Sequence, residues 1–156
     1  MEGLEILYLP DEEEVIKQVA DWHYSEFGKD NPDSTPEKTL NTVRGRVNNT
    51  GIPLCLVAYL GGRPVGTASI IATDMKTHAE FMPWMADVVV DRGHRDRGIG
   101  SALVRRVDEE MGRLNISVAY LFTPDKERMY ARLGWKTVLR ETYRGKDVVI
   151  MRKEFP

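Results

Sequence analysis

The sequence predicts a mixed α/β fold, with a single domain over residues 1–156. Short apolar, β-branched runs alternate with segments whose apolar residues recur every three or four positions, as strands alternate with amphipathic helices. One stretch, residues 88–107, passes from three valines through a glycine-bearing turn directly into such a helix. The predicted order is β-α-α-β-β-β-α-β-α-β-β, and 156 residues suffice to bury one core.

The N-terminal part is expected to hold one strand and two helices. A strand at 5–9 is followed by a helix that Asp11 caps and whose first turn is acidic, as the helix dipole favours. Thr35 and Pro36 suit the N-cap and the first position of a second helix. That helix is expected to run to about Val47.

Turn signals delimit the remaining elements. Gly61 and Gly62 form a two-residue hairpin signal between two apolar runs. A second turn is expected at 144–146. Asp125 is expected to cap the last helix. The other elements are strands at 53–60, 64–72, 81–90, 117–122, 135–141 and 148–153, and helices that start at 99 and cover 125–133.

Composition and charge narrow the class of partner. The net charge of −2 gives no basis for binding nucleic acid or an anionic membrane through bulk charge. Cys55 is the only cysteine, which suits a reducing compartment. No stretch approaches the roughly 20 apolar residues of a membrane span, and residues 1–10 lack the apolar run of a signal peptide. We therefore expect a cytoplasmic protein with no nucleic-acid or membrane partner.

The junction at residues 88–107 is suited to bind a phosphate or pyrophosphate. Four apolar residues spaced four apart, beginning with Ile99, give the helix one buried face. At a strand–loop–helix junction several free backbone N–H groups converge, and the helix dipole adds positive potential. Gly98 and Gly100 allow a ligand to approach the backbone closely.

Two well-known phosphate loops do not match this junction. A Walker A loop needs a lysine after its last glycine, but Ser101 follows Gly100 here. A dinucleotide fingerprint needs a third glycine, where this chain has Leu103, and an acid about 20 residues later. The corresponding segment, 116–119, contains no acid. Neither ATP nor NAD is therefore expected.

Two blocks of sequence instead resemble the GCN5-related N-acetyltransferase (GNAT) family. Arg95-Asp96-Arg97-Gly98-Ile99-Gly100 matches the family signature Q/R-x-x-G-x-G/A. The segment 120–135 is similar to the next unit of the family, a strand and a helix ending in Tyr-x-x-x-Gly-aromatic. The blocks have the family's order and spacing, and with the order of elements the resemblance covers essentially the whole chain.

The resemblance implies a mixed seven-stranded sheet, splayed between its fourth and fifth strands and flanked by about four helices. It also implies acetyl-CoA as cosubstrate, with its thioester arm in the gap, and no metal. The residues that the resemblance assigns to acetyl-CoA are Val88, Val89, Val90, Arg95, Asp96, Arg97, Gly98, Ile99, Gly100, Ser101, Thr123 and Tyr130.

The resemblance also implies how the acetyl group is transferred. A bulge in the fourth strand would free backbone N–H groups at 88–90 to stabilise the negative charge on the carbonyl oxygen. Tyr130, four residues before Gly134, would donate a proton to the leaving thiolate. Thr123 stands where the family often has an asparagine that contacts the pantetheine arm; its hydroxyl offers one donor fewer.

The general base is the least defined part of the expected mechanism. Asp87 is the main candidate, because a carboxylate within an apolar strand needs either a cleft or a partner such as an arginine. Both alternatives remain open from the sequence. Further candidates are Glu80, His23, His78 and His94, the histidines because their ordinary pKa lies near neutrality.

The acceptor is expected to be a small-molecule amine. The resemblance implies that the first two helices and their connecting loop form one wall of its groove, which here includes Trp22 and the segment 30–33. Two alternatives are a peptide α-amine and a module that binds acetyl-CoA without catalysis. A homodimer is among the expected states, because members of the family often dimerise.

Overall fold

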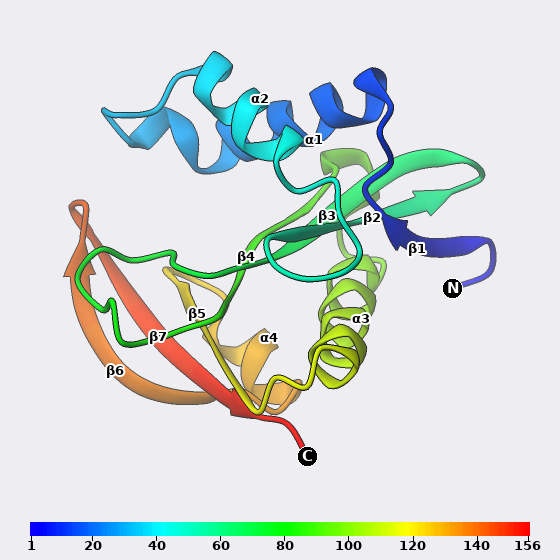
Figure 1. Ribbon diagram of the computed structural model, residues 1–156. Helices are drawn as coiled ribbons and strands as arrows, with labels where there is room; N and C mark the ends of the chain where they lie inside the picture. The colour runs from blue at the N-terminus through cyan, green and yellow to red at the C-terminus, as the bar shows by residue number, and fades with distance from the viewer.

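All seven strands and four helices that the sequence predicts are present, in the predicted order. The computed structural model describes residues 1–156 (Figure 1). The elements are β1 (Leu4–Tyr8), α1 (Glu13–Glu26), α2 (Pro36–Arg44), β2 (Leu54–Leu60), β3 (Arg63–Ile71), β4 (Trp84–Val90), α3 (Ile99–Arg113), β5 (Val118–Thr123), α4 (Glu127–Arg132), β6 (Lys136–Tyr143) and β7 (Lys146–Glu154). Two 3₁₀ turns, η1 (Gly28–Asp30) and η2 (Arg92–His94), were not predicted.

Local sequence signals explain several boundaries and fail at others. Thr35 caps α2 as predicted, since its side chain accepts from the backbone N–H of Lys38 at 3.1 Å. The prediction that Asp11 caps α1 is wrong, because Glu12 holds the N-cap position and Asp11 lies outside it. Strand β4 begins at Trp84, not at 81, directly after Pro83, which has no N–H to donate to a ladder.

The sheet consists of two antiparallel halves that meet along one short parallel contact. Its order is β1-β2-β3-β4-β5-β7-β6. Strands β4 and β5 share a single pair of facing residues, Trp84 and Tyr120, reinforced by the hydrogen bond from the Tyr120 N–H to the Pro83 carbonyl at 3.0 Å. Beyond that contact the two strands diverge toward their C-terminal ends, so the expected splay is present.

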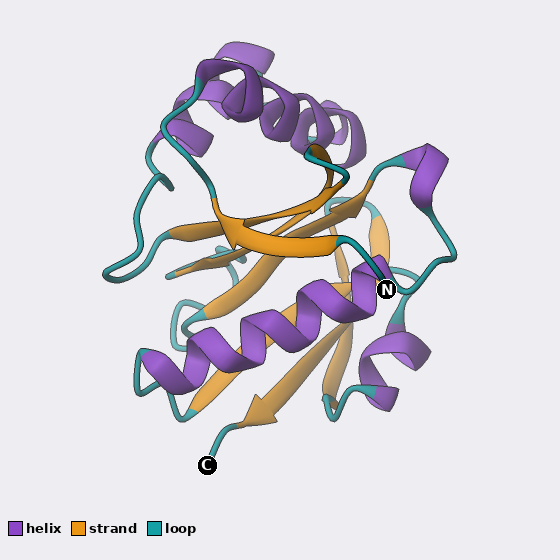
Figure 2. Cartoon of the chain, turned by 90° about the vertical axis from the view of Figure 1, so that its right-hand side faces the viewer, coloured by secondary structure: helices purple, strands orange, loops and turns teal.

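Helices cover both faces of the first half-sheet. Figure 2 shows α1 and α2 on one side of the strands and the long α3 on the other. Successive residues of β2 point to opposite faces, so Leu54 and Leu56 pack in the cluster with α3 while Cys55 and Val57 pack with α1 and α2. No helix has both the length and the apolar character that crossing a bilayer requires.

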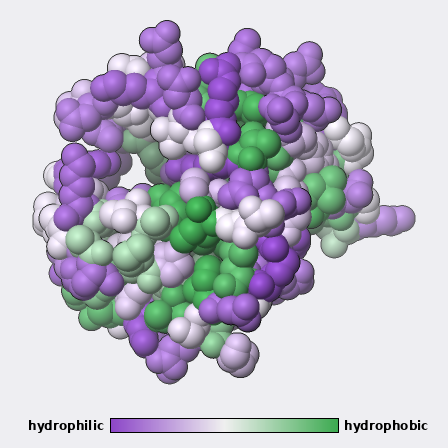
Figure 3. All heavy atoms as spheres, viewed as in Figure 1, coloured by the Kyte–Doolittle hydropathy of each residue, from purple (hydrophilic) through white to green (hydrophobic).

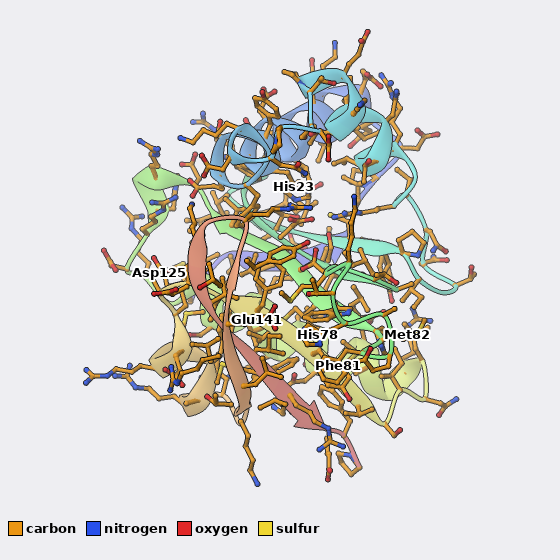
Figure 4. The ribbon with its side chains drawn as sticks, turned by 90° about the vertical axis from the view of Figure 1, so that its left-hand side faces the viewer. His23, His78, Phe81, Met82, Asp125 and Glu141 are labelled. Atoms are coloured by element: carbon orange, nitrogen blue, oxygen red, sulfur yellow. The ribbon has the colours of Figure 1, made fainter.

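The connection between β3 and β4, residues 72–83, packs against the second half-sheet. The ring of Phe81 stacks between His78 and Tyr120, with ring centroids 5.0 and 4.5 Å apart. His78 also pairs with Glu141 of β6, and Figure 4 shows His78, Phe81 and Glu141 lying together. This connection therefore joins the two half-sheets below the splay.

Close packing of β3 against β4 and α3 makes Gly66 sensitive to substitution. A Cβ at Gly66 would lie 2.9 Å from the Val89 carbonyl oxygen and 3.1 Å from Leu103 Cδ1, so Gly66→Ala is expected to lower the free energy of unfolding by about 1–3 kcal/mol. Gly112→Ala is the control, because a Cβ at this position on α3 would meet no atom within 4 Å. This substitution should raise the free energy of unfolding by roughly 0.5–1 kcal/mol. Urea unfolding measures both, and equal effects would contradict this packing.

Candidate functional site

The splay opens into a cavity of 930 Å³ bordered by β4, β5, the start of α3 and α4. The connection between α1 and α2 and the tip of the β6–β7 hairpin reach over it from opposite sides (Figure 1). Lys146 Nζ on the hairpin and Asp30 Oδ2 on the connection form an ion pair at 3.0 Å across the mouth. Figure 3, in the same view as Figure 1, shows the molecule hollowed on its left side, with hydrophilic side chains along the rim.

Strand β4 contains a bulge where it borders the cavity. Ser69 faces Ala86 and Thr67 faces Val89, so Asp87 and Val88 together oppose one residue of β3. The backbone of Asp87 has a φ of 54°, in the left-handed region. A bulge leaves backbone groups outside the ladder and redirects the strand, so β4 can present N–H groups to a ligand in the cavity.

The loop before α3 also turns N–H groups toward the cavity. The backbone has positive φ at Asp96 (62°) and at Gly98 (85°), which directs the chain into the helix. The first helical hydrogen bond runs from the Ala102 N–H to the Gly98 carbonyl at 3.0 Å, so the preceding N–H groups, 99–101, have no backbone acceptor. Free N–H groups at the start of a helix, together with the helix dipole, are suited to bind an anion.

The two arginines of this loop differ in their surroundings. Arg95 lines the cavity, but its side chain donates to the Val90 carbonyl at 3.1 Å and to Glu26 Oε1 at 2.8 Å. Arg97 is exposed and lies outside the cavity lining. Any anion in this loop would therefore depend more on backbone N–H groups than on arginine side chains.

Thr123 performs the capping role expected of Asp125. The Thr123 hydroxyl oxygen accepts from the N–H groups of Lys126 at 3.0 Å and Asp125 at 3.4 Å, whereas no side chain caps α4 at Lys126, its N-cap. The prediction for Asp125 is therefore wrong, because Thr123 at the end of β5 supplies the acceptor first. Both residues line the cavity, and Figure 4 shows Asp125 beside it. The Thr123 hydroxyl hydrogen remains free to donate.

Tyr130 of α4 lies at the inner wall of the cavity. Its side chain is buried, and its hydroxyl makes no hydrogen bond within the protein. Burial, together with the nearby charge of Asp125, raises the pKa of Tyr130 to about 12. The phenol therefore stays protonated at neutral pH and is available as a proton donor.

The sequence left open whether Asp87 faces a cleft or pairs with an arginine, and in the structure it does both. Arg46, just after α2, donates from Nη1 to Asp87 Oδ2 at 2.8 Å and to Ser69 Oγ at 3.0 Å. His23 Nδ1 lies 3.8 Å from Asp87 Oδ2. Burial alone would raise the pKa of Asp87, but His23, Arg46 and the hydrogen bond from Arg46 outweigh it and hold that pKa below its ordinary value.

The histidine candidates are placed differently. His23 is buried against the cavity, and burial lowers its pKa to about 4, so it is neutral at pH 7. Its Nε2 has no hydrogen-bond partner. His94 lines the cavity and is bonded to Asp91 at 2.9 Å. His78, with its neighbour Glu80, lies outside the lining.

Two charged residues that lie beside Asp87 in the cavity escape the sequence predictions of the site. Arg46 and Asp74 stand in polar connections between elements, where charged residues are ordinary. Arg46 falls near the predicted end of the second helix, about Val47, but α2 ends at Arg44. Neither Arg46 nor Asp74 belongs to a motif. Only the folded arrangement brings them beside Asp87.

Comparisons with known proteins agree with this geometry. The model of the Acetyltransferase (GNAT) family matches residues 16–135. A crystal structure of aminoglycoside 6'-N-acetyltransferase complexed with coenzyme A superposes with a TM-score of 0.74 at 16% identity, over 96% of each chain. A GNAT-family acetyltransferase from Streptococcus pneumoniae gives 0.69 at 18% identity, over 97% of this chain and 100% of that one.

A third structure, yncA from Salmonella typhimurium with its cofactor acetyl-CoA, gives a TM-score of 0.73 at 15% identity, over 99% of this chain and 95% of that one. At these identities the structural likeness concerns the fold. A search of curated proteins gives no match. Since the family model covers most of the chain, the protein belongs to the GNAT family of acetyltransferases.

The ion pair between Arg46 and Asp87 is expected to stabilise the fold in a pH-dependent way. Arg46→Leu leaves a largely buried carboxylate without its cation, which should lower the free energy of unfolding at pH 7 by roughly 3 kcal/mol. The lowered pKa of Asp87 in the wild type means that its contribution is full above the unfolded-state pKa and is lost as the pH falls through the folded-state value. At pH 4 the wild-type pair is still largely intact, but burial raises the pKa of the unpaired Asp87 in Arg46→Leu. That carboxyl is then protonated, so the deficit of the variant should shrink at pH 4.

Urea unfolding of Arg46→Leu, Asp87→Asn and the double variant at both pH values measures the coupling. The double variant should recover much of the loss, because no unpaired charge remains. Additive losses at pH 7, or a deficit that does not change with pH, would contradict the pairing.

Proposed function

We propose that this acetyltransferase moves the acetyl group of acetyl-CoA to the primary amine of a small molecule by direct attack of the amine on the thioester. The observation that carries the proposal is the convergence of three groups on one cavity. These are the free N–H groups that begin α3, the bulge of β4 and the unbonded hydroxyl of Tyr130. They correspond to a diphosphate site, an oxyanion site and a proton donor.

The donor half of the cavity suits acetyl-CoA. The diphosphate would bind the N–H groups from Gly98 to Ser101, with Asp96 and Ile99 shaping the loop and Arg95 adding positive charge. Arg97, which is exposed, would contribute only through its longer-range charge. The pantetheine arm would then run along the backbone of β4, where Thr123 can donate its hydroxyl hydrogen. The structures that contain coenzyme A and acetyl-CoA support this choice of donor.

The chemistry follows from the groups around the bulge. The N–H groups of 88–90 polarise the thioester carbonyl, the neutral amine attacks its carbon, and the C–S bond breaks. The leaving thiolate, with an ordinary pKa of about 8.5, takes the proton of Tyr130. Asp87 stays ionised beside the reacting carbon, because its pKa is lowered, and it attracts and orients the cationic acceptor.

A small-molecule acceptor fits a cavity whose mouth is spanned by an ion pair. The Lys146–Asp30 bridge spans the opening, so an extended chain could not lie across it while the pair is made. The aminoglycoside acetyltransferases of the same fold support an amine of this size. We also propose a cytoplasmic location, which the single, buried and unpaired Cys55 suits.

Replacement of Tyr130 by phenylalanine tests the proton donor. Tyr130→Phe should lower turnover by about 10²- to 10⁴-fold and leave the Kd of acetyl-CoA nearly unchanged, because the ring remains and only the proton is lost. Turnover is measured with Ellman's reagent over a panel of primary amines, and the Kd by calorimetry. Tyr120→Phe, on β5 outside the cavity, is the control. A wild type that binds acetyl-CoA but acetylates nothing would favour the non-catalytic module.

Replacement of Gly100 by alanine tests the diphosphate site. The nearest atom to a Cβ there is Val90 Cγ2 at 3.6 Å, an ordinary contact, so the fold should tolerate the change. The methyl group lies at the N–H groups that hold the diphosphate, and loss of charged hydrogen bonds should weaken acetyl-CoA binding about 10- to 100-fold. Gly112→Ala, at the far end of α3, should bind like the wild type in calorimetry. Equal affinities for the two variants would place the diphosphate elsewhere.

A further inference from the structure

The proposed reaction needs a group that removes a proton from the acceptor. A primary amine such as that of lysine has an ordinary pKa of about 10.4 and is protonated at neutral pH, so it cannot attack. Asp87 is a weak base, because Arg46 holds its charge. His23 is a weaker base than an ordinary histidine, since burial lowers its pKa to about 4. Glu80 lies outside the cavity lining.

One carboxylate of the cavity lining is neither exposed nor paired within the protein. Asp33, Asp96 and Asp125 also line the cavity without a partner, but they are exposed. Asp74, on the connection between β3 and β4, lines the cavity and makes no hydrogen bond or ion pair. The next residue, Met75, is completely buried under the second half-sheet, so the backbone at Asp74 is held in place. A carboxylate that only stabilises a loop usually accepts hydrogen bonds from the backbone N–H groups of that loop. The carboxylate of Asp74 accepts none.

The charged groups that face Asp74 come from three other parts of the chain. Asp87 belongs to β4, Arg46 follows α2, and Arg144 stands at the tip of the β6–β7 hairpin. Burial and then Asp87 raise the pKa of Asp74, Arg46 and Arg144 lower it, and the balance is a pKa of about 7. A base of this strength accepts a proton at neutral pH and returns it to water easily.

We propose that Asp74 is the catalytic base that takes the proton of the acceptor ammonium, an inference that rests on the proposed function. An oxygen of Asp74 removes one proton from the ammonium. The N–C bond then forms as the C–S bond breaks, the electron pair of that bond leaves on sulfur, and the sulfur takes the proton of Tyr130. A second proton leaves the amide nitrogen and restores Tyr130 through water. Asp74 releases its proton to solvent, so each turnover yields one amide, one thiol and one proton.

The pH dependence of catalysis separates this role from a structural one. Asp74→Asn should lower kcat/KM at pH 7 by about 10²-fold and remove the acidic limb of its pH profile, whereas the Kd of acetyl-CoA stays unchanged. Asp74→Glu should keep a pH-dependent limb, because it retains a carboxylate. The assay uses acetyl-CoA with kanamycin, spermidine and a peptide that has a free α-amine. Glu80→Gln, the same change on the same connection, is the control and should match the wild type.

The outcomes distinguish failure of the inference from failure of the proposed function. If the wild type binds acetyl-CoA but acetylates none of these amines, the proposed function fails and the inference fails with it. If the wild type is active and Asp74→Asn keeps both its rate and its pH profile, only the inference fails. Carboxyl ¹³C NMR of the intact wild type needs no variant to fold. A titration of Asp74 near 7 supports the inference, and one below 5 overturns it.

Discussion

The parting of β4 from β5 is the constraint on which the rest of the structure depends. Two parallel strands that paired along their length would leave no space between the half-sheets, but here only Trp84 and Tyr120 face each other. The gap is kept open because each half is completed separately, by α1, α2 and α3 on one side and by the β5–β7–β6 hairpin sheet on the other. The stack of His78, Phe81 and Tyr120 then joins the connection between β3 and β4 to β5, near the point where the two strands pair.

The bulge in β4 places the charged side chain of Asp87 inside the molecule. Asp87 has a left-handed backbone, which a residue other than glycine adopts at a cost of order 1 kcal/mol, and it carries a carboxylate into the interior. The hydrogen bond from Arg46 to Asp87 offsets the free-energy cost of burying the carboxylate, and the same guanidinium also donates to Ser69. The ion pair also links the connection after α2 to the central sheet. The helices that cover the cavity are thus anchored through the strand that borders it.

The sequence predicts local features well and the convergence of distant residues poorly. The Gly61-Gly62 hairpin, the Thr35 cap and the start of α3 at Ile99 depend on neighbouring residues, and the structure confirms them. The position of the bulge depends on the register between β3 and β4, and the Arg46–Asp87 pair joins residues 41 positions apart. Asp74 lies in a polar connection and Arg46 at the end of a predicted helix, and neither belongs to a motif, so nothing in the sequence distinguishes them from solvated charges.

Placed close together, Asp74 and Asp87 differ because their surroundings differ. His23 and Arg46, which donates directly to Asp87, lower the pKa of Asp87, so Asp87 is an anion at neutral pH. Asp74 has no donor, and burial together with the negative charge of Asp87 raises its pKa. The direct effect of Arg46 on Asp74 is to lower its pKa, but burial and the charge of Asp87 outweigh that effect. When their surroundings give two neighbouring acids different pKa values, the two acids can take different roles. The acid with the lower pKa attracts a cation, and the acid with the higher pKa accepts a proton. A single carboxylate held by Arg46 could attract an ammonium ion but would be too weak a base to deprotonate it.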